Sequence, residues 1–238
     1  MKHVRLHQNA KLQVNNKYTL DEYGSHHLTK VLRFPQGQNI TIFNGDGMDY
    51  LATVLQIKKY CEVEIYDCLK NNSESDLNIT LAQGVAKGEK MDFLMQKAVE
   101  LGVNKIVPIM SERCVVKLKG GKLKKRHQHW CKIVVGACEQ SGRSIVPVVE
   151  NPVTFNEFID RGVNNGFVLH HRAQKSLLEM DKTNEATILI GPEGGFADNE
   201  INLAIDSGYK ALLLGSRVLR TETASLAVIA NMQLLWGS

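Results

Sequence analysis

The chain has 238 residues, 43% of them hydrophobic and 23% charged, and its formal net charge is +4. These values are typical of a globular protein with one large domain or two modest ones. No apolar run reaches the roughly 18 residues of a transmembrane helix, and the N-terminal sequence MKHVRLHQNAKLQV lacks the apolar segment of a secretory signal. The 5 cysteines are odd in number and never form CxxC, which favours reduced thiols in a cytosolic protein over a disulfide framework or a zinc site.

The first part of the chain alternates in hydrophobicity with a period of two. Residues 39–69 contain NITIF, a turn at Asn44-Gly45-Asp46-Gly47, MDYLATVLQI and YCEVEIYDCL. Asn-Gly and Asp-Gly between alternating segments predict β-hairpins. The amphipathic segment Asp21–Leu32 predicts a helix. This region therefore predicts a small β-barrel with one helix, and the polar residues 70–76 predict a linker.

Beyond the linker the hydrophobic period changes, and strands alternate with helices. The pattern predicts strands at 77–85, 105–110, 146–150, 166–170, 187–190 and 211–214. It predicts helices at 88–102, 122–141, 154–162, 198–208 and 223–236. Such alternation indicates an α/β fold with a parallel sheet. The last helix is apolar nearly all round and must be covered on more than one side, for which a second subunit is a natural candidate.

Polar loops follow three of these strands. The strand at 187–190 runs into the turn IGPEGGF, the strand at 211–214 runs into GSRVLRTETA, and His170 and His171 follow a third strand. The carboxyl ends of parallel strands meet at one edge of a sheet, so these loops predict a binding pocket. Gly194 and Gly195 would let a ligand approach the backbone closely. The alternative is a tight turn with a helix cap at Thr221 or Thr223, which leaves Arg217, Arg220 and Glu222 unexplained.

Several familiar sites are absent from the sequence. It has no GxxxxGK[ST] phosphate loop, and no GxGxxG after the first strand of the α/β region. These absences argue against a Walker-type nucleotide site, a Rossmann dinucleotide enzyme and a Rossmann methyltransferase. Without HExxH or paired CxxC, no metal is expected, and the pairs His26-His27 and His170-His171 are weak candidates for metal ligands.

A basic run extends from Lys117 to Lys132, KLKGGKLKKRHQHWCK, with 7 Lys or Arg and no acid. Such runs are most often solvated helix faces. The functional interpretation is a surface for nucleic-acid phosphates. Trp130 and His127 would add stacking in that case, although Trp130 also fits a core position.

The longer motifs resemble one family. The blocks LAQGVAKGEKMDFLMQKAVELGV, SERCVVKL, ACEQSGR, IGPEGGF and LGSRVLRTETA are similar to those of the bacterial 16S ribosomal RNA uridine-N3 methyltransferases, which belong to the SPOUT class. The N-terminal region with HHLTKVLRFPQGQNITIFNGDG is similar to their PUA-like RNA-binding domain. The resemblance covers nearly the whole chain. The sequence departs from the family pattern at His171, where proline is frequent, and at Ala197, where a serine or threonine cap is common.

The resemblance implies a PUA-like RNA-binding β-barrel at residues 1–72 and a SPOUT α/β domain at residues 73–238, with a deep trefoil knot from about residue 165. It implies S-adenosylmethionine as the methyl donor, held by three loops. The donor-binding residues that it implies are Leu169, His170, Gly191, Pro192, Glu193, Gly194, Gly195, Leu214, Gly215, Ser216, Val218, Leu219, Arg220, Thr221, Thr223 and Ala224.

Methyl transfer to uracil N3 needs loss of the imide proton or stabilisation of negative charge on the carbonyl oxygens. Arg220 is the candidate for charge stabilisation, and Glu222 is a candidate base or a group that orients Arg220. A structural ion pair between these two residues is the alternative. Glu193 is a weaker candidate for the base.

The predicted partners are 16S ribosomal RNA in the assembled 30S subunit, where the family target is uridine 1498, and a second copy of the chain in a homodimer formed through the knot. The expected location is the cytoplasm. The candidate RNA contacts are Arg5, His7, Arg33, Arg113, Lys117, Lys122, Lys124, Lys125, Arg126 and Arg143. Two alternatives stay open: a SPOUT enzyme acting on transfer RNA or on a ribose 2′-hydroxyl, and a non-catalytic RNA-binding assembly factor.

Overall fold

The computed structural model describes residues 4–116 and 120–237. Its contacts divide the chain into two compact units. The first unit comprises the residues up to Glu74 together with Cys138–Val146, and the second comprises Ser75–Ala137 and the residues from Pro147 onward. The segment Cys138–Val146 thus groups with the first unit, although the sequence pattern attaches it to a helix of the α/β region.

The first unit is built on a five-stranded sheet. Its strands are β1 (Arg5–His7), β2 (Lys17–Thr19), β3 (Asn39–Phe43), β4 (Met48–Gln56) and β5 (Glu62–Lys70). The order is β1-β3-β4-β5-β2, in which β1 and β3 are parallel and the other pairs antiparallel. The hairpins predicted from the alternating pattern are confirmed. The strands β1 and β2 were not predicted, because three residues are too few to show alternation.

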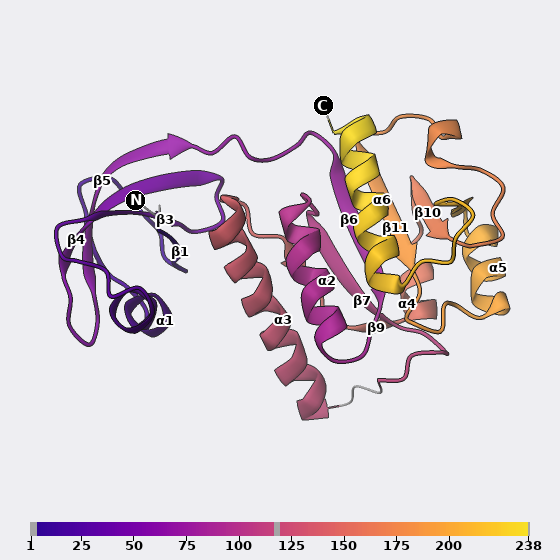
Figure 1. Ribbon diagram of the computed structural model, residues 1–238, viewed down its shortest axis with the longest axis horizontal. Coiled ribbons are helices and arrows are strands. Elements are labelled where there is room, and N and C mark those ends of the chain that lie inside the picture. Colours follow the sequence, from indigo (N-terminus) through magenta and orange to yellow (C-terminus); the bar gives the residue numbers. More distant parts are fainter. Residues whose placement is uncertain (1–3, 117–119, 238) are drawn as a thin grey trace. The chain divides into compact units, whose positions relative to one another are not determined.

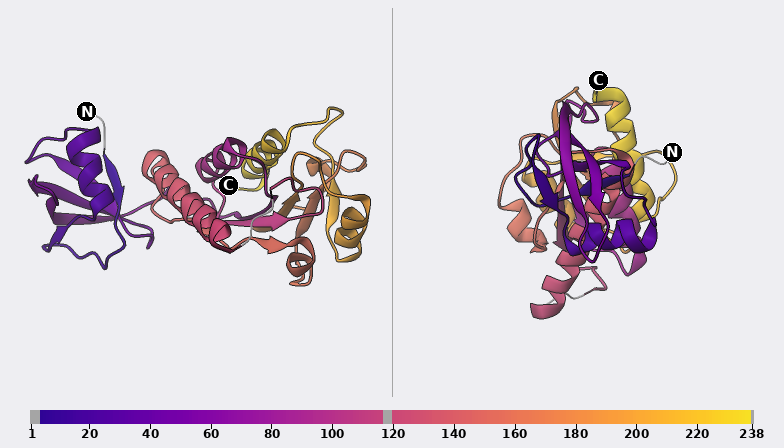
Figure 2. Two further views of the ribbon diagram at one scale, coloured as in Figure 1. Left: turned by 90° about the horizontal axis from the view of Figure 1, so that it is seen from below. Right: turned by 90° about the vertical axis from the view of Figure 1, so that its left-hand side faces the viewer.

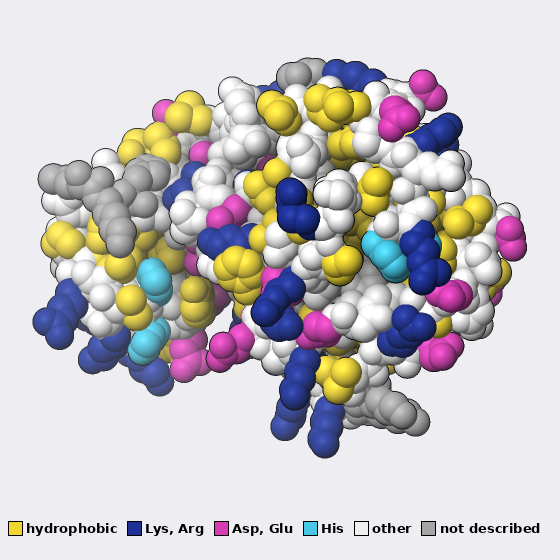
Figure 3. All heavy atoms as spheres, turned by 45° about the vertical axis from the view of Figure 1, so that its right-hand side comes forward, with side chains coloured by type: hydrophobic (Ala, Val, Ile, Leu, Met, Phe, Trp, Pro, Cys, Tyr) yellow, Lys and Arg dark blue, Asp and Glu magenta, His cyan; other side chains and the backbone are white. Residues whose placement is uncertain are grey.

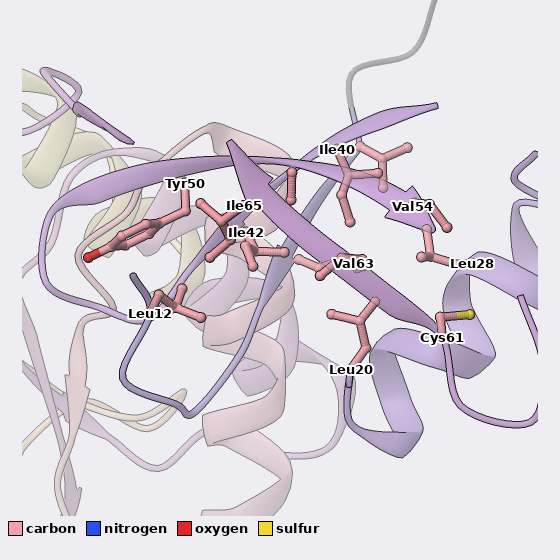
Figure 4. Packing of buried hydrophobic residues seen from close by; sticks show 13 residues of the cluster. Leu12, Leu20, Leu28, Ile40, Ile42, Tyr50, Val54, Cys61, Val63 and Ile65 are labelled. Atoms are coloured by element: carbon pink, nitrogen blue, oxygen red, sulfur yellow. The ribbon is translucent and has the colours of Figure 1, made fainter. Parts of the chain in front are cut away.

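One face of this sheet carries the core of the first unit. Ile40, Ile42, Val63 and Ile65 point to this face and are fully or almost fully buried (Figure 4). The predicted helix is present as α1 (Glu22–His26), which continues into the π-helical turn η1 (His27–Val31). The Asp21 side chain caps α1 by accepting a hydrogen bond from the Gly24 amide at 2.7 Å.

The second unit is an α/β domain. Its strands are β6 (Asn78–Gly84), β7 (Lys105–Met110), β8 (Val148–Val149), β9 (Val153–Thr154), β10 (Gly166–Leu169), β11 (Glu185–Ile190) and β12 (Lys210–Leu212). Its helices are α2 (Glu89–Glu100), α3 (Gly120–Ser141), whose last residues belong to the first unit, α4 (Phe155–Ile159), η2 (Leu177–Glu179), α5 (Asp198–Asp206) and α6 (Thr221–Trp236). The predicted parallel sheet is confirmed, with the order β12-β10-β11-β6-β7-β8 and β9 beside β7.

Helices cover both faces of this sheet. The helices α2 and α6 lie on one face and α4 and α5 on the other (Figures 1 and 2). On the second face Phe155 and Phe158 of α4 and Ile201 of α5 pack against Val168 and Leu189 of the strands. This two-sided cover explains why the strands read as continuous apolar runs rather than as alternating segments.

The closing helix α6 packs against α2 and against β6 and β11. It begins at Thr221, two residues earlier than the sequence predicted. Met232 is fully buried within the chain, whereas Leu234 is 78% exposed. The chain itself therefore buries part of the apolar surface of α6, for which the sequence analysis had suggested a second subunit. Within residues 4–116 and 120–237, no helix is long and apolar enough to cross a membrane.

Candidate functional site

A cavity of about 460 Å³ lies at the carboxyl ends of β10, β11 and β12, which are neighbours in the sheet. Three loops form its wall: the residues after β10, the turn after β11, and the segment between β12 and α6. Of the predicted donor-binding residues, the following line it: Leu169, His170, Gly191, Pro192, Glu193, Gly194, Gly195, Leu214, Gly215, Val218, Leu219, Thr221 and Ala224. The three strand ends that the sequence pattern placed side by side therefore surround one cavity.

The turn after β11 packs too tightly for larger residues at one position. A Cβ atom on Gly191 would lie 2.7 Å from the carbonyl carbon of Gly195 and from the amide nitrogen of Phe196. Gly195 has φ +66°, a conformation that L residues rarely adopt, and open space where a Cβ would point. The two glycines thus let the backbone fold onto itself and present itself to the cavity.

A buried polar network connects this turn with the start of α6. The Gln83 side chain at the end of β6 is fully buried, and its Nε2 donates to Thr221 Oγ1 at 2.9 Å and towards the Gly191 carbonyl at 3.3 Å. Thr221 Oγ1 donates to the same carbonyl at 2.7 Å, and Ser225 Oγ donates to Gln83 Oε1 at 2.6 Å. Gly84 beside it has no room for a Cβ, which would lie 2.4 Å from the Pro192 nitrogen.

This network was missed at the sequence level. The available signal was one amide side chain inside the apolar strand LAQGV, and the fold is needed to show that its partners come from two distant loops. Thr221 is also not the helix cap that the alternative interpretation proposed. The N-cap position belongs to Arg220, and its side chain makes no capping hydrogen bond. The Thr221 hydroxyl serves the turn after β11 instead.

The remaining predicted residues of this loop lie at or beyond the edge of the cavity. Ser216, Arg220 and Thr223 do not line it. Arg220 is exposed, and it forms no ion pair with Glu222 or another acid within the part of the chain that the structure describes. Glu222 Oε2 is buried and accepts no hydrogen bond from the described residues. The structural ion pair that was the alternative explanation for these two residues is therefore not formed.

The cavity rim is rich in cationic groups. Arg172 and Arg217 line it beside His171, and Arg113 Nη1 donates towards the carbonyls of Gly194 and Phe196, at 3.3 Å each. Arg113 was predicted as an RNA contact, and the structure places it against the turn after β11.

Two titratable groups of the cavity have shifted pKa values. Burial, with smaller effects of His171 and Arg172, lowers the pKa of His170, so its imidazole is neutral at pH 7. Burial would raise the pKa of Glu193, but the Lys87 amide, 3.0 Å from Oε1, and the Lys90 ammonium lower it. Glu193 is thus an ionised partner of the β6–α2 loop, which weakens its candidacy as a base.

The predicted RNA contacts in the first unit need correction. Arg5 donates two hydrogen bonds of 2.9 Å to the Asp49 carboxylate, and its side chain is only 9% exposed. Arg143 donates to both oxygens of Glu74, at 2.8 and 2.6 Å, and is 4% exposed. These guanidinium groups hold the first unit together and are not presented to phosphates. The sequence could not show this, because both pairs join segments far apart in the chain.

His7 is half-buried, its ring packs edge-on against Phe43, and its amide donates to Glu139 Oε1 at 3.0 Å. Burial lowers the pKa of His7, so its ring is uncharged at pH 7. These features do not favour a phosphate contact at His7. Arg33 is exposed and has φ +48°.

Part of the basic run forms the exposed start of α3. Lys122, Lys124 and Lys125 are exposed, whereas Arg126 Nη2 donates to the Gly88 carbonyl at 3.1 Å. Trp130 is fully buried, so it is a core residue and not a stacking platform. Lys117 lies outside the described residues. Figure 3 shows Lys and Arg side chains interspersed with acids over the face in view, rather than one continuous basic patch.

Across the described ranges 4–116 and 120–237, no group of three or more His, Cys, Asp and Glu side chains is placed to hold a metal ion.

Two family models match the chain. An RNA methyltransferase domain matches residues 73–233, and an RNA methyltransferase PUA domain matches residues 20–66. Among curated relatives, the ribosomal RNA small subunit methyltransferase E of Buchnera aphidicola subsp. Schizaphis graminum is 37% identical over 230 residues, which are 95% of this chain and 94% of that protein. The protein of the same name from Bacillus subtilis is 31% identical over 86% of this chain and 85% of its own.

Solved structures with the same fold are also known. A methyltransferase from Legionella pneumophila, in complex with the bound cofactor SAM, has a TM-score of 0.97 and 37% identity, with full coverage of both chains. A ribosomal RNA small subunit methyltransferase E from Neisseria gonorrhoeae, bound to S-adenosyl methionine, has a TM-score of 0.93 and 38% identity, covering 99% of this chain and 98% of that one.

Proposed function

We propose that this chain methylates N3 of a uridine in 16S ribosomal RNA. The premise is that the chain belongs to the ribosomal RNA small subunit methyltransferase E family and is an S-adenosylmethionine-dependent ribosomal RNA methyltransferase. The proposed target is uridine 1498 in the assembled 30S subunit. The observation that carries the proposal is the cavity at three adjacent strand ends, in a chain that matches these relatives over almost its full length.

The cavity suits the methyl donor. Its strand-end side chains Leu169, Ile190 and Leu212 are apolar, and no lysine among the described residues lines it. The tight turn at Gly191 and the open space at Gly195 expose backbone groups, which can read a neutral adenine without a phosphate cradle. The donor-binding residues are proposed to be those of the three loops, with Ser216, Arg220 and Thr223 completing the set from the edge.

S-adenosylmethionine supplies a methyl group on a sulfonium, and the chain must align the acceptor with it. The uracil imide proton has to leave N3, so negative charge develops on the neighbouring carbonyl oxygens. We propose that the exposed Arg220 guanidinium stabilises this charge. The buried, unpartnered Oε2 of Glu222 is the candidate proton acceptor. The neutral imidazole of His170 adds no positive charge against a cationic donor.

RNA recognition is proposed to use both predicted domains. Residues 1–72 would form the PUA-like RNA-binding domain and residues 73–238 the methyltransferase domain. The exposed lysines at the start of α3 are the best placed of the predicted contacts in the second unit, because their ammonium groups have no acid partner among the described residues. A target nucleotide inside folded RNA would have to be unstacked to reach the cavity.

A homodimer formed through the knotted region is part of the proposal. The exposed Leu234 and Leu235 of α6 and the exposed Val218 of the preceding loop are apolar, which favours a covered surface there. Leu234→Glu would test the dimer, because the Leu234 side chain is exposed in the single chain. Met232 on the same helix is unsuitable for this test, because it is already buried within one chain. The trefoil knot stays a prediction from the resemblance. A substrate in the ribosomal subunit would place the protein in the cytoplasm.

The decisive experiment incubates unmodified 30S subunits with the protein and labelled S-adenosylmethionine, followed by mapping of the methylated nucleoside. We expect label on N3 of one uridine of 16S RNA. Label on transfer RNA or on a ribose 2′-hydroxyl would replace this function with another RNA methyltransferase activity. Donor binding without transfer to any RNA would favour an assembly factor.

A further inference from the structure

The first unit has a groove of about 850 Å³ that the methyl-transfer chemistry does not use. One wall is formed by α1 and η1, and the other by the turn between β4 and β5. Six of its side chains have chemistry suited to nucleic acid: Tyr23, His26, Lys30, Lys58, Lys59 and Tyr60. We call it the helix–turn groove. Its volume falls within the range of about 300–1,000 Å³ found for small-molecule sites.

The two walls are joined from beneath by buried hydrogen bonds. The Cys61 amide donates to Ser25 Oγ at 3.0 Å, and the Leu20 amide donates to the Cys61 carbonyl at 2.9 Å. Ser25 is fully buried, and Leu28 and Cys61 belong to the same core (Figure 4). The groove is therefore preformed, so a ligand would not have to order its walls.

Exposed aromatic rings on both walls offer stacking surfaces. Tyr23 is 53% exposed and Tyr60 is 44% exposed. The Tyr23 ring is held in place, because it stacks on His27 at 6.0 Å and its hydroxyl donates to Glu139 Oε2 at 3.3 Å. Exposed aromatic side chains beside basic groups are the usual platform for unpaired bases.

The charge of the groove favours an anion. Lys30, Lys58 and Lys59 are exposed, and Lys59 Nζ lies 5.5 Å from the Tyr60 ring centroid. Two acids, Asp21 and Glu22, also line the groove, and the Asp21 carboxylate accepts hydrogen bonds from the Gly24 amide and from Gln8 Nε2. Among the described lining residues three lysines thus face two acids, which leaves a positive balance.

The geometry points to an RNA site in this groove: one or more unpaired nucleotides stack on Tyr60 and Tyr23 while the lysines contact the flanking phosphates. The inference deepens the proposed function, because it rests on RNA being the substrate. It replaces the predicted contacts Arg5 and Arg143 with residues that the sequence had not marked. The π-helical turn η1 in one wall is consistent with it, since such turns are rare and occur frequently at functional sites.

The test measures binding of a labelled single-stranded RNA oligonucleotide of mixed sequence to the full chain. Tyr60→Ala should weaken binding about 10-fold or more, the effect of losing one base stack. Tyr66→Ala is the matched control, because Tyr66 lies on β5 of the same unit and is 46% exposed. We expect no change in that variant. Equal affinities for the two variants would overturn the inference.

The lysines are tested by salt dependence. Replacing Lys58 and Lys59 by alanine should flatten the slope of log affinity against log salt concentration by about 1.4, at roughly 0.7 per phosphate contact. The same replacement at the exposed Lys11 and Lys17 of this unit is the control, with an unchanged slope. A smaller slope in both pairs would mean that only overall charge matters, and the groove would not be the site.

Two further readouts separate this inference from the proposed function. S-adenosylmethionine affinity and the thermal midpoint should stay unchanged in every groove variant, which shows that the fold and the cavity are intact. If the wild type methylates 16S RNA while groove variants bind RNA normally, the groove inference fails and the proposed function stands. If groove variants bind the 30S subunit weakly but protein-free RNA normally, the groove binds a protein and the inference is overturned.

Discussion

The first unit joins distant segments through two arginine–carboxylate pairs of low exposure, whereas the second unit joins the loops beside its cavity through neutral side chains. Arg5 pairs with Asp49 and Arg143 with Glu74 in the first unit. The Gln83 amide and the Thr221 hydroxyl meet at the Gly191 carbonyl in the second. Neutral groups can fix a backbone turn without adding charge next to a cationic ligand. The comparison shows that a polar residue in a sequence reveals its role only through its partners.

The largest expected effect is the loss of a buried ion pair in the first unit. Arg5→Met should lower the free energy of unfolding of that unit by about 3 kcal/mol, because it leaves a mostly buried carboxylate without its cation. Arg161→Met is the control, since its pair with Glu150 is more exposed and should cost about 1 kcal/mol or less. Chemical denaturation monitors both. A lower affinity for S-adenosylmethionine in Arg5→Met would contradict the claim that this ion pair stabilises the first unit alone.

The next largest effect concerns an arginine without a structural partner. Arg220→Ala should lower the single-turnover methylation rate about 100-fold, the scale of losing one donor to a developing oxyanion. Donor affinity should fall far less than the rate, because Arg220 lies only at the edge of the cavity, and the thermal midpoint should change little, because the guanidinium is exposed. If stability falls and the rate survives, Arg220 is a structural residue like Arg5.

A smaller effect is expected from the neutral network. Gln83→Leu should weaken S-adenosylmethionine binding about 10-fold, because it removes the donor to Thr221 Oγ1 and the acceptor of the Ser225 hydroxyl, and both of these groups are buried. Asn104→Leu removes a comparable hydrogen bond, which the Ile79 amide near the opposite end of β6 donates to Asn104 Oδ1, and should leave donor affinity unchanged. Calorimetry compares the two. Equal donor affinities would mean that Gln83 contributes stability alone.

The smallest effect is a pH dependence of the first unit. Burial alone would raise the pKa of Asp49, but hydrogen bonds from Arg5, Ser144 and Asn71 outweigh it and lower the pKa below its ordinary value. A carboxylate with a depressed pKa stabilises the fold above its unfolded value, and this contribution is lost as the pH falls through the folded value. The unfolding free energy should therefore decline below about pH 4, and the decline should be weaker in Asp49→Asn. An equal decline in both proteins would assign it to other carboxylates.

Much of the fold could be predicted from the sequence. The hairpins of the first unit follow from alternation and Asn-Gly turns, and the α/β order of the second unit follows from the change of period. The strand at 105–110 agrees with β7 residue for residue. Short elements such as β1, β2 and η2 were missed, because three residues carry no period.

The candidate site was predictable in part. The glycine turn and the strand-end loops carry local signals, so their meeting point followed from the topology of a parallel sheet. Gln83 carries no such signal, because an amide in a strand is unremarkable until its partners are known. The sequence signal at Arg5 and Arg143 is misleading, since a positive charge in an RNA-binding protein suggests a contact with RNA phosphates. Tyr60 became a candidate only when the fold placed it across a groove from Tyr23.

The grouping of Cys138–Val146 with the first unit has a consequence for how the protein is made. Arg143 supplies the cation for Glu74, and the Ser144 hydroxyl joins Arg5 and Asp49. A ribosome that has synthesised only the first 74 residues has therefore delivered a sheet in which Glu74 lacks its arginine, while the Arg5–Asp49 pair lacks only the Ser144 hydroxyl. N-terminal domains usually fold first during synthesis. Here the first unit can close its Arg143–Glu74 pair only after the segment Cys138–Val146 has left the exit tunnel, so it is completed late despite being at the N-terminal end.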